Sequence, residues 1–235
     1  ANLGQTSPAY VDWDGDGIPD LVVLIGRLLL FLRNVGTAAA PKLLGPNEIR
    51  AEDGARVISH RAKPALVDWD GDGLVDVIGH GEDLQRLMLF RRYRDTAAGE
   101  LKLRPGEPLR YADGSLIVPT EWHRYTKFYN VGDWKGTGAY DIFLGVSDQI
   151  LHLENVGTNE APAFLPPVRL AVDGEPIRVG HHESLPVPVD WDGTGRPDLF
   201  VSGESGLFHL FRRAYLDGDH RRIRCEIAEY EGQAK

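Results

Sequence analysis

Aspartates at alternate positions form the clearest chemical pattern in this sequence. DWDGDGIPD begins at Asp12, and DWDGDGLVD begins at Asp68. In each stretch, carboxylates at positions one, three, five and nine can converge on one centre with the carbonyl of position seven, because glycine permits a sharp turn. Such a cage of hard oxygen ligands is the one that Ca²⁺ prefers, and packing four carboxylates together without a cation is costly. The predicted ligands are Asp12, Asp14, Asp16, Asp20, Asp68, Asp70, Asp72 and Asp76.

Two further copies of this nonapeptide are altered at positions that a cation needs. DWDGTGRPD carries Thr194 at position five, so we expect weaker Ca²⁺ binding there. Its remaining ligands are Asp190, Asp192 and Asp198. DWKGTGAYD, which runs from Asp133 to Asp141, carries Lys135 at position three. Because an ammonium group there can pair with the remaining carboxylates and replace the cation, we expect no Ca²⁺ in this copy.

Histidine-containing stretches precede three of the copies by about the same distance: ISHRAKP, EWHRYTKF and VGHHESLP. In a repeat protein, equivalent positions lie at equivalent heights, so these stretches are expected to face one funnel, with His80 on a neighbouring turn. The residues of interest are His60, Arg61, Trp122, His123, Arg124, Tyr125, His181 and His182. Two alternatives remain open, namely histidines that only hydrogen-bond the backbone and a three-histidine Zn²⁺ site.

The elements that must position these residues come from a fourfold repeat. The nonapeptides begin at residues 12, 68, 133 and 190; each follows a short alternating stretch and precedes two apolar runs. We read each unit as four short antiparallel strands, which predicts an all-β protein, a β-propeller of four-stranded antiparallel blades. The repeats span approximately 1–57, 58–119, 120–179 and 180–235, within a single domain covering 1–235. Either they form a compact four-bladed ring or they are part of a larger propeller.

Tryptophan and arginine recur within this repeat. The tryptophan after each first aspartate is expected to pack between blades, whereas Trp122 stands outside the repeat and could be a stacking platform for a sugar. The arginines at 91, 92 and 94 and at 221, 222 and 224 are expected to be solvated.

Composition narrows the function classes. The net charge of -9 argues against a nucleic-acid partner, because no broad basic face is available for phosphate. The longest apolar stretch, LVVLIGRLLLFL from Leu21 to Leu32, is too short to span a bilayer and reads as two buried strands, so no membrane insertion is expected. The N-terminal ANLGQTSP has no signal peptide, so any targeting segment was removed or never present.

The repeated pattern resembles a known family. P-x-x-VDWDGDG-x-x-D-[LV], an apolar run and then N-V-G-T-x-x-x-P is similar to the FG-GAP (VCBS) repeat. That repeat builds integrin-like propellers, fungal propeller lectins and several bacterial polysaccharide lyases. The resemblance implies that bound calcium braces blades and performs no chemistry. Together with the millimolar Ca²⁺ that fills weak cages outside cells, it also implies an extracellular, periplasmic or cell-surface protein.

The stretch GHHESLPVPVDWDGTGRPDLF is similar to the His-His blade of ulvan and rhamnose–glucuronate lyases. This resemblance implies β-elimination on a uronate-containing, acidic polysaccharide. His181 or His182 would be the base or bind the carboxylate, His123 and Tyr125 would be acid/base partners, and Arg61 and Arg124 the cations. His60 and Trp122 would contact substrate. The alternative is a non-catalytic glycan- or protein-binding propeller, lectin-like or adhesive, with further blades or a partner chain.

Overall fold

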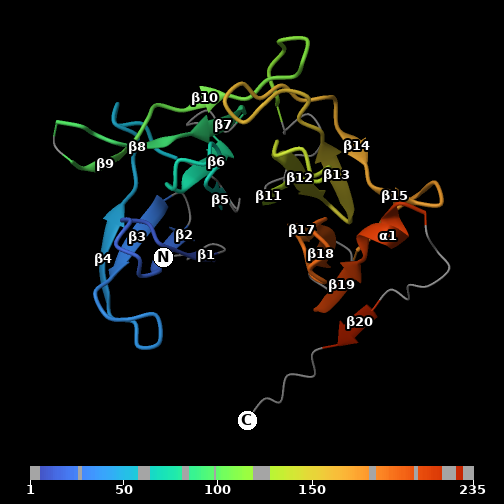
Figure 1. The fold of residues 1–235 in the computed structure, drawn as a ribbon, viewed down its shortest axis with the longest axis horizontal. Helices are drawn as coiled ribbons and strands as arrows, with labels where there is room; N and C mark the ends of the chain where they lie inside the picture. The colour runs from blue at the N-terminus through green and yellow to red at the C-terminus, as the bar shows by residue number, and fades with distance from the viewer. Residues whose placement is uncertain are drawn as a thin grey trace. The chain divides into compact units, whose positions relative to one another are not determined.

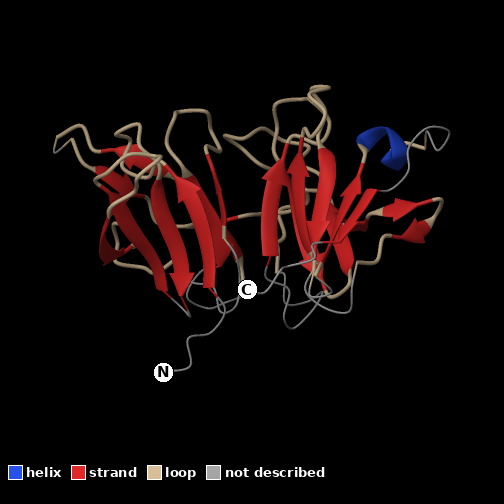
Figure 2. Ribbon diagram, turned by 90° about the horizontal axis from the view of Figure 1, so that it is seen from below, coloured by secondary structure: helices blue, strands red, loops and turns tan. Residues whose placement is uncertain are grey.

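The computed structural model describes residues 6–25, 28–57, 64–80, 85–97, 99–118, 128–179, 184–203, 206–218 and 226–229. Within these residues the chain is almost wholly β, with one short helix, α1 (Arg213–Leu216) (Figures 1 and 2). The contacts divide the chain into two compact units. Unit 1 comprises Ala1–Arg110 and Ser115–Pro119, and unit 2 comprises Tyr111–Gly114 and Thr120–Lys235. Among the described residues, no helix is long and apolar enough to cross a membrane.

Unit 1 contains two four-stranded antiparallel sheets, which we call blades 1 and 2. Blade 1 has the order β1 (Thr6–Val11), β2 (Asp20–Ile25), β3 (Leu28–Asn34) and β4 (Leu43–Glu48). Blade 2 has the order β5 (Ala65–Val67), β6 (Asp76–His80), β7 (Leu87–Phe90) and β10 (Glu107–Pro108). A separate hairpin of β8 (Arg92–Arg94) and β9 (Leu101–Leu103) is inserted before β10.

Unit 2 repeats this plan in blades 3 and 4. Blade 3 has the order β11 (Phe128–Gly132), β12 (Asp141–Val146), β13 (Gln149–Leu153) and β14 (Val168–Arg169). Blade 4 has the order β17 (Leu185–Val189), β18 (Asp198–Ser202), β19 (Leu207–Phe211) and β20 (Glu226–Glu229). The hairpin of β15 (Ala171–Val172) and β16 (Glu175–Pro176) lies between them in the chain.

The expected fold class is confirmed, since these are four antiparallel four-stranded sheets of the β-propeller blade type. Each nonapeptide connects the first and second strands of its blade, and its ninth residue begins the second strand. The apolar run from Leu21 to Leu32 forms most of β2 and β3, as predicted.

Within each unit, a face of one blade packs against the next blade. Trp13, Val22 and Leu29 of blade 1 share a core cluster with Val77 and Phe90 of blade 2. In unit 2, the corresponding cluster joins Trp134, Phe143 and Ile150 of blade 3 to Leu199 and Val201 of blade 4. We call the sheet side that faces the nonapeptide tryptophan the tryptophan face of a blade, and the other side its opposite face.

An arginine contacts the nonapeptide tryptophan at each of these interfaces. Arg92 lies 4.0 Å from the centre of the Trp13 ring and donates to the Trp13 carbonyl oxygen. Arg213 makes the same two contacts with Trp134, again at 4.0 Å. The prediction of a solvated Arg92 is therefore wrong: the side chain is buried, and burial lowers its pKa to about 10. Both pairs are separated by 79 residues, so units 1 and 2 repeat one two-blade design.

Candidate calcium loops

The aspartate at position one folds the loop in all four copies. In blade 1, the Asp12 carboxylate accepts hydrogen bonds from the N–H groups of Gly15 and Gly17, at 2.9 Å each. Asp68 does the same with Gly71 and Gly73, at 2.9 and 3.0 Å. In unit 2, Asp133 accepts from Thr137 and Gly138, and Asp190 from Thr194 and Gly195. Gly15 and Gly17 have φ of 75° and 86°, a conformation that side chains other than glycine rarely adopt.

The aspartate at position nine links the loop to the third strand. Its carboxylate accepts a hydrogen bond from a backbone N–H group at, or just after, the end of the third strand. The distances are 2.7 Å for Asp20 to Asn34, 2.7 Å for Asp76 to Arg92, 2.7 Å for Asp141 to Asn155 and 2.6 Å for Asp198 to Arg213. All four aspartates are at most 3% exposed. Positions one and nine therefore hold the blade together whether or not a cation is bound.

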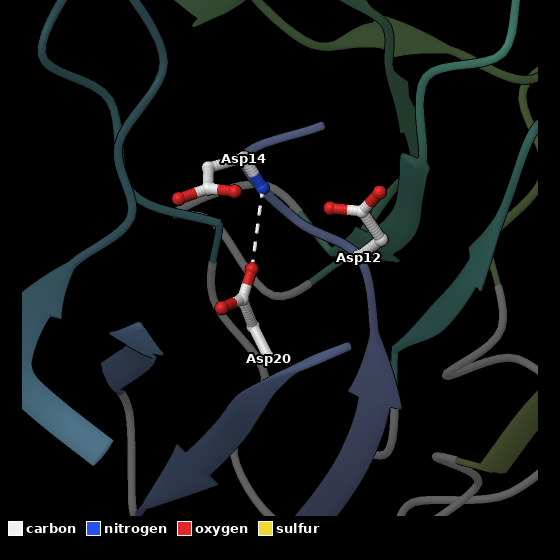
Figure 3. A group of neighbouring side chains, drawn as sticks. All are labelled: Asp12, Asp14 and Asp20. Atoms are coloured by element: carbon white, nitrogen blue, oxygen red, sulfur yellow. Dashed lines mark hydrogen bonds between the residues drawn. The ribbon is translucent and has the colours of Figure 1, made fainter. Parts of the chain in front are cut away.

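The structure brings together three carboxylates in blade 1. Oxygen atoms of Asp12, Asp14 and Asp20 all lie within 4.8 Å of one another (Figure 3). Two oxygens that bind one Ca²⁺ at about 2.3–2.6 Å can be at most about 5 Å apart, so this spacing fits the ion. Burial and the neighbouring Asp20 raise the pKa of the Asp14 carboxyl.

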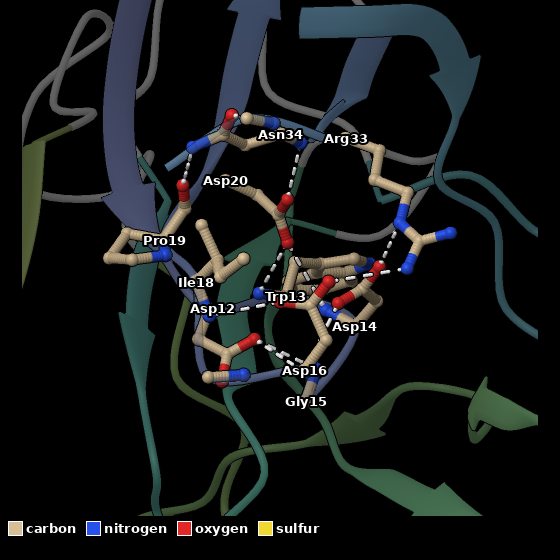
Figure 4. Close-up of polar contacts among 12 residues, drawn as sticks. Asp12, Trp13, Asp14, Gly15, Asp16, Ile18, Pro19, Asp20, Arg33 and Asn34 are labelled. Atoms are coloured by element: carbon tan, nitrogen blue, oxygen red, sulfur yellow. Dashed lines mark hydrogen bonds and ion pairs between the residues drawn. The ribbon is translucent and has the colours of Figure 1, made fainter. Parts of the chain in front are cut away.

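An arginine competes for this first cage. Arg33 Nε lies 2.6 Å from Asp14 Oδ2, and Arg33 Nη2 lies 3.2 Å from Asp16 Oδ2 (Figure 4). Asp16 is drawn toward the arginine and does not belong to the group of three carboxylates. The guanidinium therefore pairs with both side chains at positions three and five and offsets one of their two negative charges.

The cage of blade 2 is less neutralised. Asp68, Asp70 and Asp76 form the same group of oxygens within 4.8 Å, and Asp72 again lies outside it. Arg91 Nε is 3.7 Å from Asp70 Oδ2, while Arg91 Nη1 bonds Glu107 at 2.8 Å. Asp70 Oδ1 is shielded from solvent and has no hydrogen-bond partner among the described residues. A shielded carboxylate oxygen without a donor is the feature expected of a cation ligand.

Burial also perturbs the acids of this second cage. It raises the pKa of Asp76 to about 6, with smaller contributions in the same direction from Asp70 and Asp72. Burial and the charge of Asp72 raise the pKa of Asp70 as well. Both pKa values are raised because buried, closely spaced carboxylates resist ionisation. A divalent cation in the cage would stabilise the ionised carboxylates.

In blade 3 a lysine and a histidine take part in the contacts around the loop. Lys135 pairs with Glu154, and not with the carboxylates of its own loop as the sequence predicts. The reason is that the end of the third strand lies opposite position three, and blade 3 carries glutamate there in place of arginine. Asp141 Oδ2 is instead 2.9 Å from His152 Nε2, and both side chains are buried.

In blade 4, where Thr194 replaces the aspartate at position five, an arginine bridges two of the remaining aspartates. Arg212 Nη1 is 3.3 Å from Asp192 and 3.2 Å from Asp198. The predicted ligands Asp190, Asp192 and Asp198 do not form a three-carboxylate group of the kind seen in blades 1 and 2; among the described residues, only those two blades contain one.

A scan against models of known protein families finds no match, and a search of characterised proteins finds none with significant similarity.

The predicted catalytic and substrate residues lie outside the described residues. They fall in three segments, 58–63, 119–127 and 180–183, which contain His60, Arg61, Trp122, His123, Arg124, Tyr125, His181 and His182. The prediction that places His80 on a turn is wrong. His80 ends β6, pairs in register with Leu87 and is 1% exposed, because β6 is an inner strand whose five residues are all buried.

A groove in unit 1 is a second candidate site. It has a volume of about 460 Å³ and includes the Trp13 and Phe31 side chains. Glu48 pairs with Arg50 at 2.7 Å, and Lys102 pairs with Asp95. Glu52 accepts a hydrogen bond from the Tyr93 hydroxyl, a contact that supplies no positive charge. The groove therefore combines aromatic side chains with a polar rim in which most charges are paired.

The charge pairing of the loops has a signal in the sequence beyond the spacing of the nonapeptides. The residue at the end of the third strand is Arg33, Arg91, Glu154 or Arg212 in the four blades. Its charge is opposite to that of position three in every copy, including the reversed pair in blade 3. Aligning the third strands as well as the loops would have identified the partner of Lys135.

Proposed function

We propose that the chain is a calcium-binding propeller protein of the FG-GAP (VCBS) type, in which Ca²⁺ braces blades 1 and 2. The observation that carries this proposal is Asp70 Oδ1, a shielded oxygen without a donor in a group of three carboxylates. Blade 2 is the stronger site, because Arg33 in blade 1 pairs with Asp14 and Asp16 and offsets one of their two charges. Blade 4 binds more weakly through Asp190, Asp192 and Asp198, and blade 3 binds none.

Titration of chelator-treated protein with Ca²⁺ tests this proposal. Isothermal titration calorimetry should give two tight sites and one weaker site per chain. Asp70→Asn should remove one tight site and leave the other. The matched control is Asp148→Asn, which changes an aspartate that pairs with Arg178 outside the nonapeptides. Retention of both tight sites in Asp70→Asn would contradict the assignment.

We further propose that the protein acts on an acidic, uronate-containing polysaccharide by β-elimination. Support comes from the sequence, in which three histidine-containing stretches precede nonapeptides at similar distances. It also comes from topology, since each stretch leads directly into the first strand of a blade: β5, β11 or β17. Equivalent entry points are suited to assembling one site from several repeats.

The chemistry assigns a role to each residue. A base, His181 or His182, removes the C5 proton of the uronate, and Arg61 or Arg124 offsets the charge on its carboxylate. The electron pair forms the C4–C5 double bond as the bond from C4 to the glycosidic oxygen breaks. His123 or Tyr125 protonates that oxygen. His60 and Trp122 contact the neighbouring sugar.

Incubation with a panel of uronate polymers tests this reaction, because the unsaturated product absorbs ultraviolet light. The His181→Ala, His182→Ala variant should lose the absorbance change while its circular dichroism stays the same. The matched control is His209→Ala, a histidine on β19 outside these stretches. Absence of any absorbance change with the unmodified protein would overturn the lyase proposal.

The groove in unit 1 favours a second candidate, non-catalytic glycan binding. Aromatic side chains beside a polar rim suit the faces and hydroxyl groups of a sugar. If glycans bind without cleavage, and Phe31→Ala abolishes binding while His181→Ala, His182→Ala does not, this second function is the correct one.

A further inference from the structure

The first calcium cage already holds a positive group of the protein. Arg33 Nε lies 2.6 Å from Asp14 Oδ2, and Arg33 Nη2 donates to Asp16 Oδ2 at 3.2 Å (Figure 4). Among the described residues, the guanidinium contacts no other acceptor. The two carboxylates stand at positions three and five of the nonapeptide, so Arg33 occupies side chains that a bound Ca²⁺ would use.

In blade 1 the loop satisfies these carboxylates without a metal. Asp14 Oδ2 faces Arg33, and Asp14 Oδ1 accepts the Asp16 N–H group at 3.2 Å. Asp16 Oδ1 accepts the Ile18 N–H group at 2.9 Å. In blade 2 the counterpart of Asp14 is Asp70, whose Oδ1 has no hydrogen-bond partner among the described residues. The two cages therefore share a sequence pattern but differ in how far the protein fills them.

A guanidinium and a calcium ion are poor neighbours at one carboxylate. Because Ca²⁺ binds carboxylate oxygens at about 2.3–2.6 Å, an ion held by Asp14 would lie within a few ångström of Arg33. Like charges so close repel each other. The Arg33 side chain is 50% exposed, and an exposed ion pair is weak, so the guanidinium can move into water at small cost.

The arginine of blade 2 is placed differently. Arg91 Nε is 3.7 Å from Asp70 Oδ2, which is longer than a hydrogen bond, and Arg91 Nη1 lies 2.8 Å from Glu107. The Arg91 side chain is only 15% exposed. Arg91 is thus held beside its cage by Glu107, whereas Arg33 is held in its cage by the ligands themselves.

We propose that Arg33 is an internal competitor of Ca²⁺ that sets the affinity of the first cage by exchange. In the calcium-free fold the guanidinium holds Asp14 and Asp16; when Ca²⁺ binds, the guanidinium leaves Asp14 for water and Asp16 is released. The chain then fills in two steps, blade 2 at a lower free Ca²⁺ concentration and blade 1 at a higher one. This inference rests on the proposed function, in which both cages bind Ca²⁺.

Calorimetry on chelator-treated protein measures the competition. In an Asp70→Asn background, which leaves the first cage as the tight site, Arg33→Gln should lower its dissociation constant for Ca²⁺ by about three- to tenfold. Arg33→Lys keeps the positive charge and should give a smaller gain. The matched control is Arg178→Gln, which removes an exposed arginine that pairs with Asp148 outside the nonapeptides, and it should change nothing.

The second cage provides a further control. In an Asp14→Asn background, which isolates this cage, Arg91→Gln should change the dissociation constant by less than about twofold, because Arg91 makes no hydrogen bond to Asp70.

Thermal unfolding separates competition from a purely structural role. In chelator, Arg33→Gln should lower the melting temperature, because the loop loses both ion pairs. At one fixed excess of Ca²⁺, the rise in melting temperature caused by calcium should be larger in this variant than in the unmodified chain, because stabilisation by a ligand grows as its dissociation constant falls. A residue that only supported the loop would not increase the response to calcium.

Nuclear magnetic resonance follows the exchange directly. The Arg33 Nε–H signal, assigned by its loss in Arg33→Gln, should move in step with filling of the first cage. Two results overturn the proposal while calcium binding stands: a first-cage affinity equal in Arg33→Gln and the unmodified chain, or an Arg33 signal that does not move at saturating Ca²⁺. If the unmodified chain binds no Ca²⁺, the proposed function fails and this inference fails with it.

Discussion

Units 1 and 2 fold the same loop four times but treat its charges differently. In unit 1, positions three and five are aspartates in both copies: Asp14 and Asp16, then Asp70 and Asp72. In unit 2, threonine occupies position five in both copies, and Lys135 occupies position three in one. The backbone hydrogen bonds to positions one and nine are nevertheless present in all four blades.

This difference separates two roles within one motif. Positions one and nine accept backbone hydrogen bonds and are needed to form the blade. Positions three and five carry the side-chain charge that differs between the blades, and in blades 1, 2 and 4 an arginine at the end of the third strand pairs with the aspartate at position three. In blade 3 the two charges are exchanged, so that Lys135 at position three pairs with Glu154 at the end of the third strand. The comparison predicts which substitutions affect both units and which affect only one.

The largest effect is expected at position nine, in both units. Asp20→Ala and Asp141→Ala should each lower the free energy of unfolding by about 3–5 kcal/mol, because buried N–H groups lose their acceptor and, in blade 3, His152 loses its partner. Urea unfolding in chelator measures the loss. Asp16→Ala is the control and should cost under about 1 kcal/mol in chelator. A small effect of Asp141→Ala would show that the ninth position is not structural.

Removal of calcium should affect unit 1 much more than unit 2. At a free Ca²⁺ concentration about one hundred times the dissociation constant, binding stabilises a site by about 2.7 kcal/mol. Chelator should therefore speed hydrogen exchange at the Gly71 and Gly73 amides, which donate to Asp68. The equivalent amides of Gly138 and Gly195 in unit 2 should change much less. Mass spectrometry measures the exchange. Equal changes in both units would contradict a difference in calcium dependence between them.

The second cage should also show a pH dependence. The pKa of Asp76 is raised to about 6 in the folded chain, so the folded state holds this proton more tightly than the unfolded state. In calcium-free buffer, Asp76 therefore contributes stability at low pH that is lost as the pH rises from about 4 to about 6.

Calcium affinity should change in the other direction, because the ion needs the ionised carboxylate. The affinity should fall by about tenfold between pH 7 and pH 5. Calorimetry in an Asp14→Asn background isolates the second cage. The same affinity at pH 5 and pH 7 would be incompatible with a protonated Asp76 in the calcium-free fold.

The smallest effect is expected for the reversed ion pair of blade 3. Lys135 and Glu154 are partly exposed, so Lys135→Glu should cost only about 0.2–1 kcal/mol, and adding Glu154→Lys should restore most of it. The cost should be equal with and without Ca²⁺. Thermal unfolding of the two single variants and the double variant measures the coupling, and a double variant no more stable than Lys135→Glu would exclude it.

Much of the fold could be predicted because its signals are local. Glycines that accept positive φ, an aspartate that caps its own loop and alternating apolar residues all act over a few neighbouring positions. They indicate four strand–loop–strand units and the strands β2 and β3 in advance. The candidate cages follow from the same local pattern, although Asp16 and Asp72 do not belong to the groups that contain their neighbours.

The rest depends on residues far apart in the chain. The sequence predicts a solvated Arg92, yet this side chain is buried and donates a hydrogen bond to Trp13, 79 residues earlier in the chain. Lys135 finds Glu154 across 19 residues, and not the aspartates beside it. Trp191 has the same sequence context as three buried tryptophans but is exposed.

The sequence by itself determined the all-β repeat, the position of each loop and the residues that could bind calcium, since these depend on local turn chemistry and alternation. Only the tertiary structure decided which charge neutralises each loop and which aromatic face remains exposed. The physical reason is that charge pairing and burial depend on what an adjacent strand or blade places opposite each side chain.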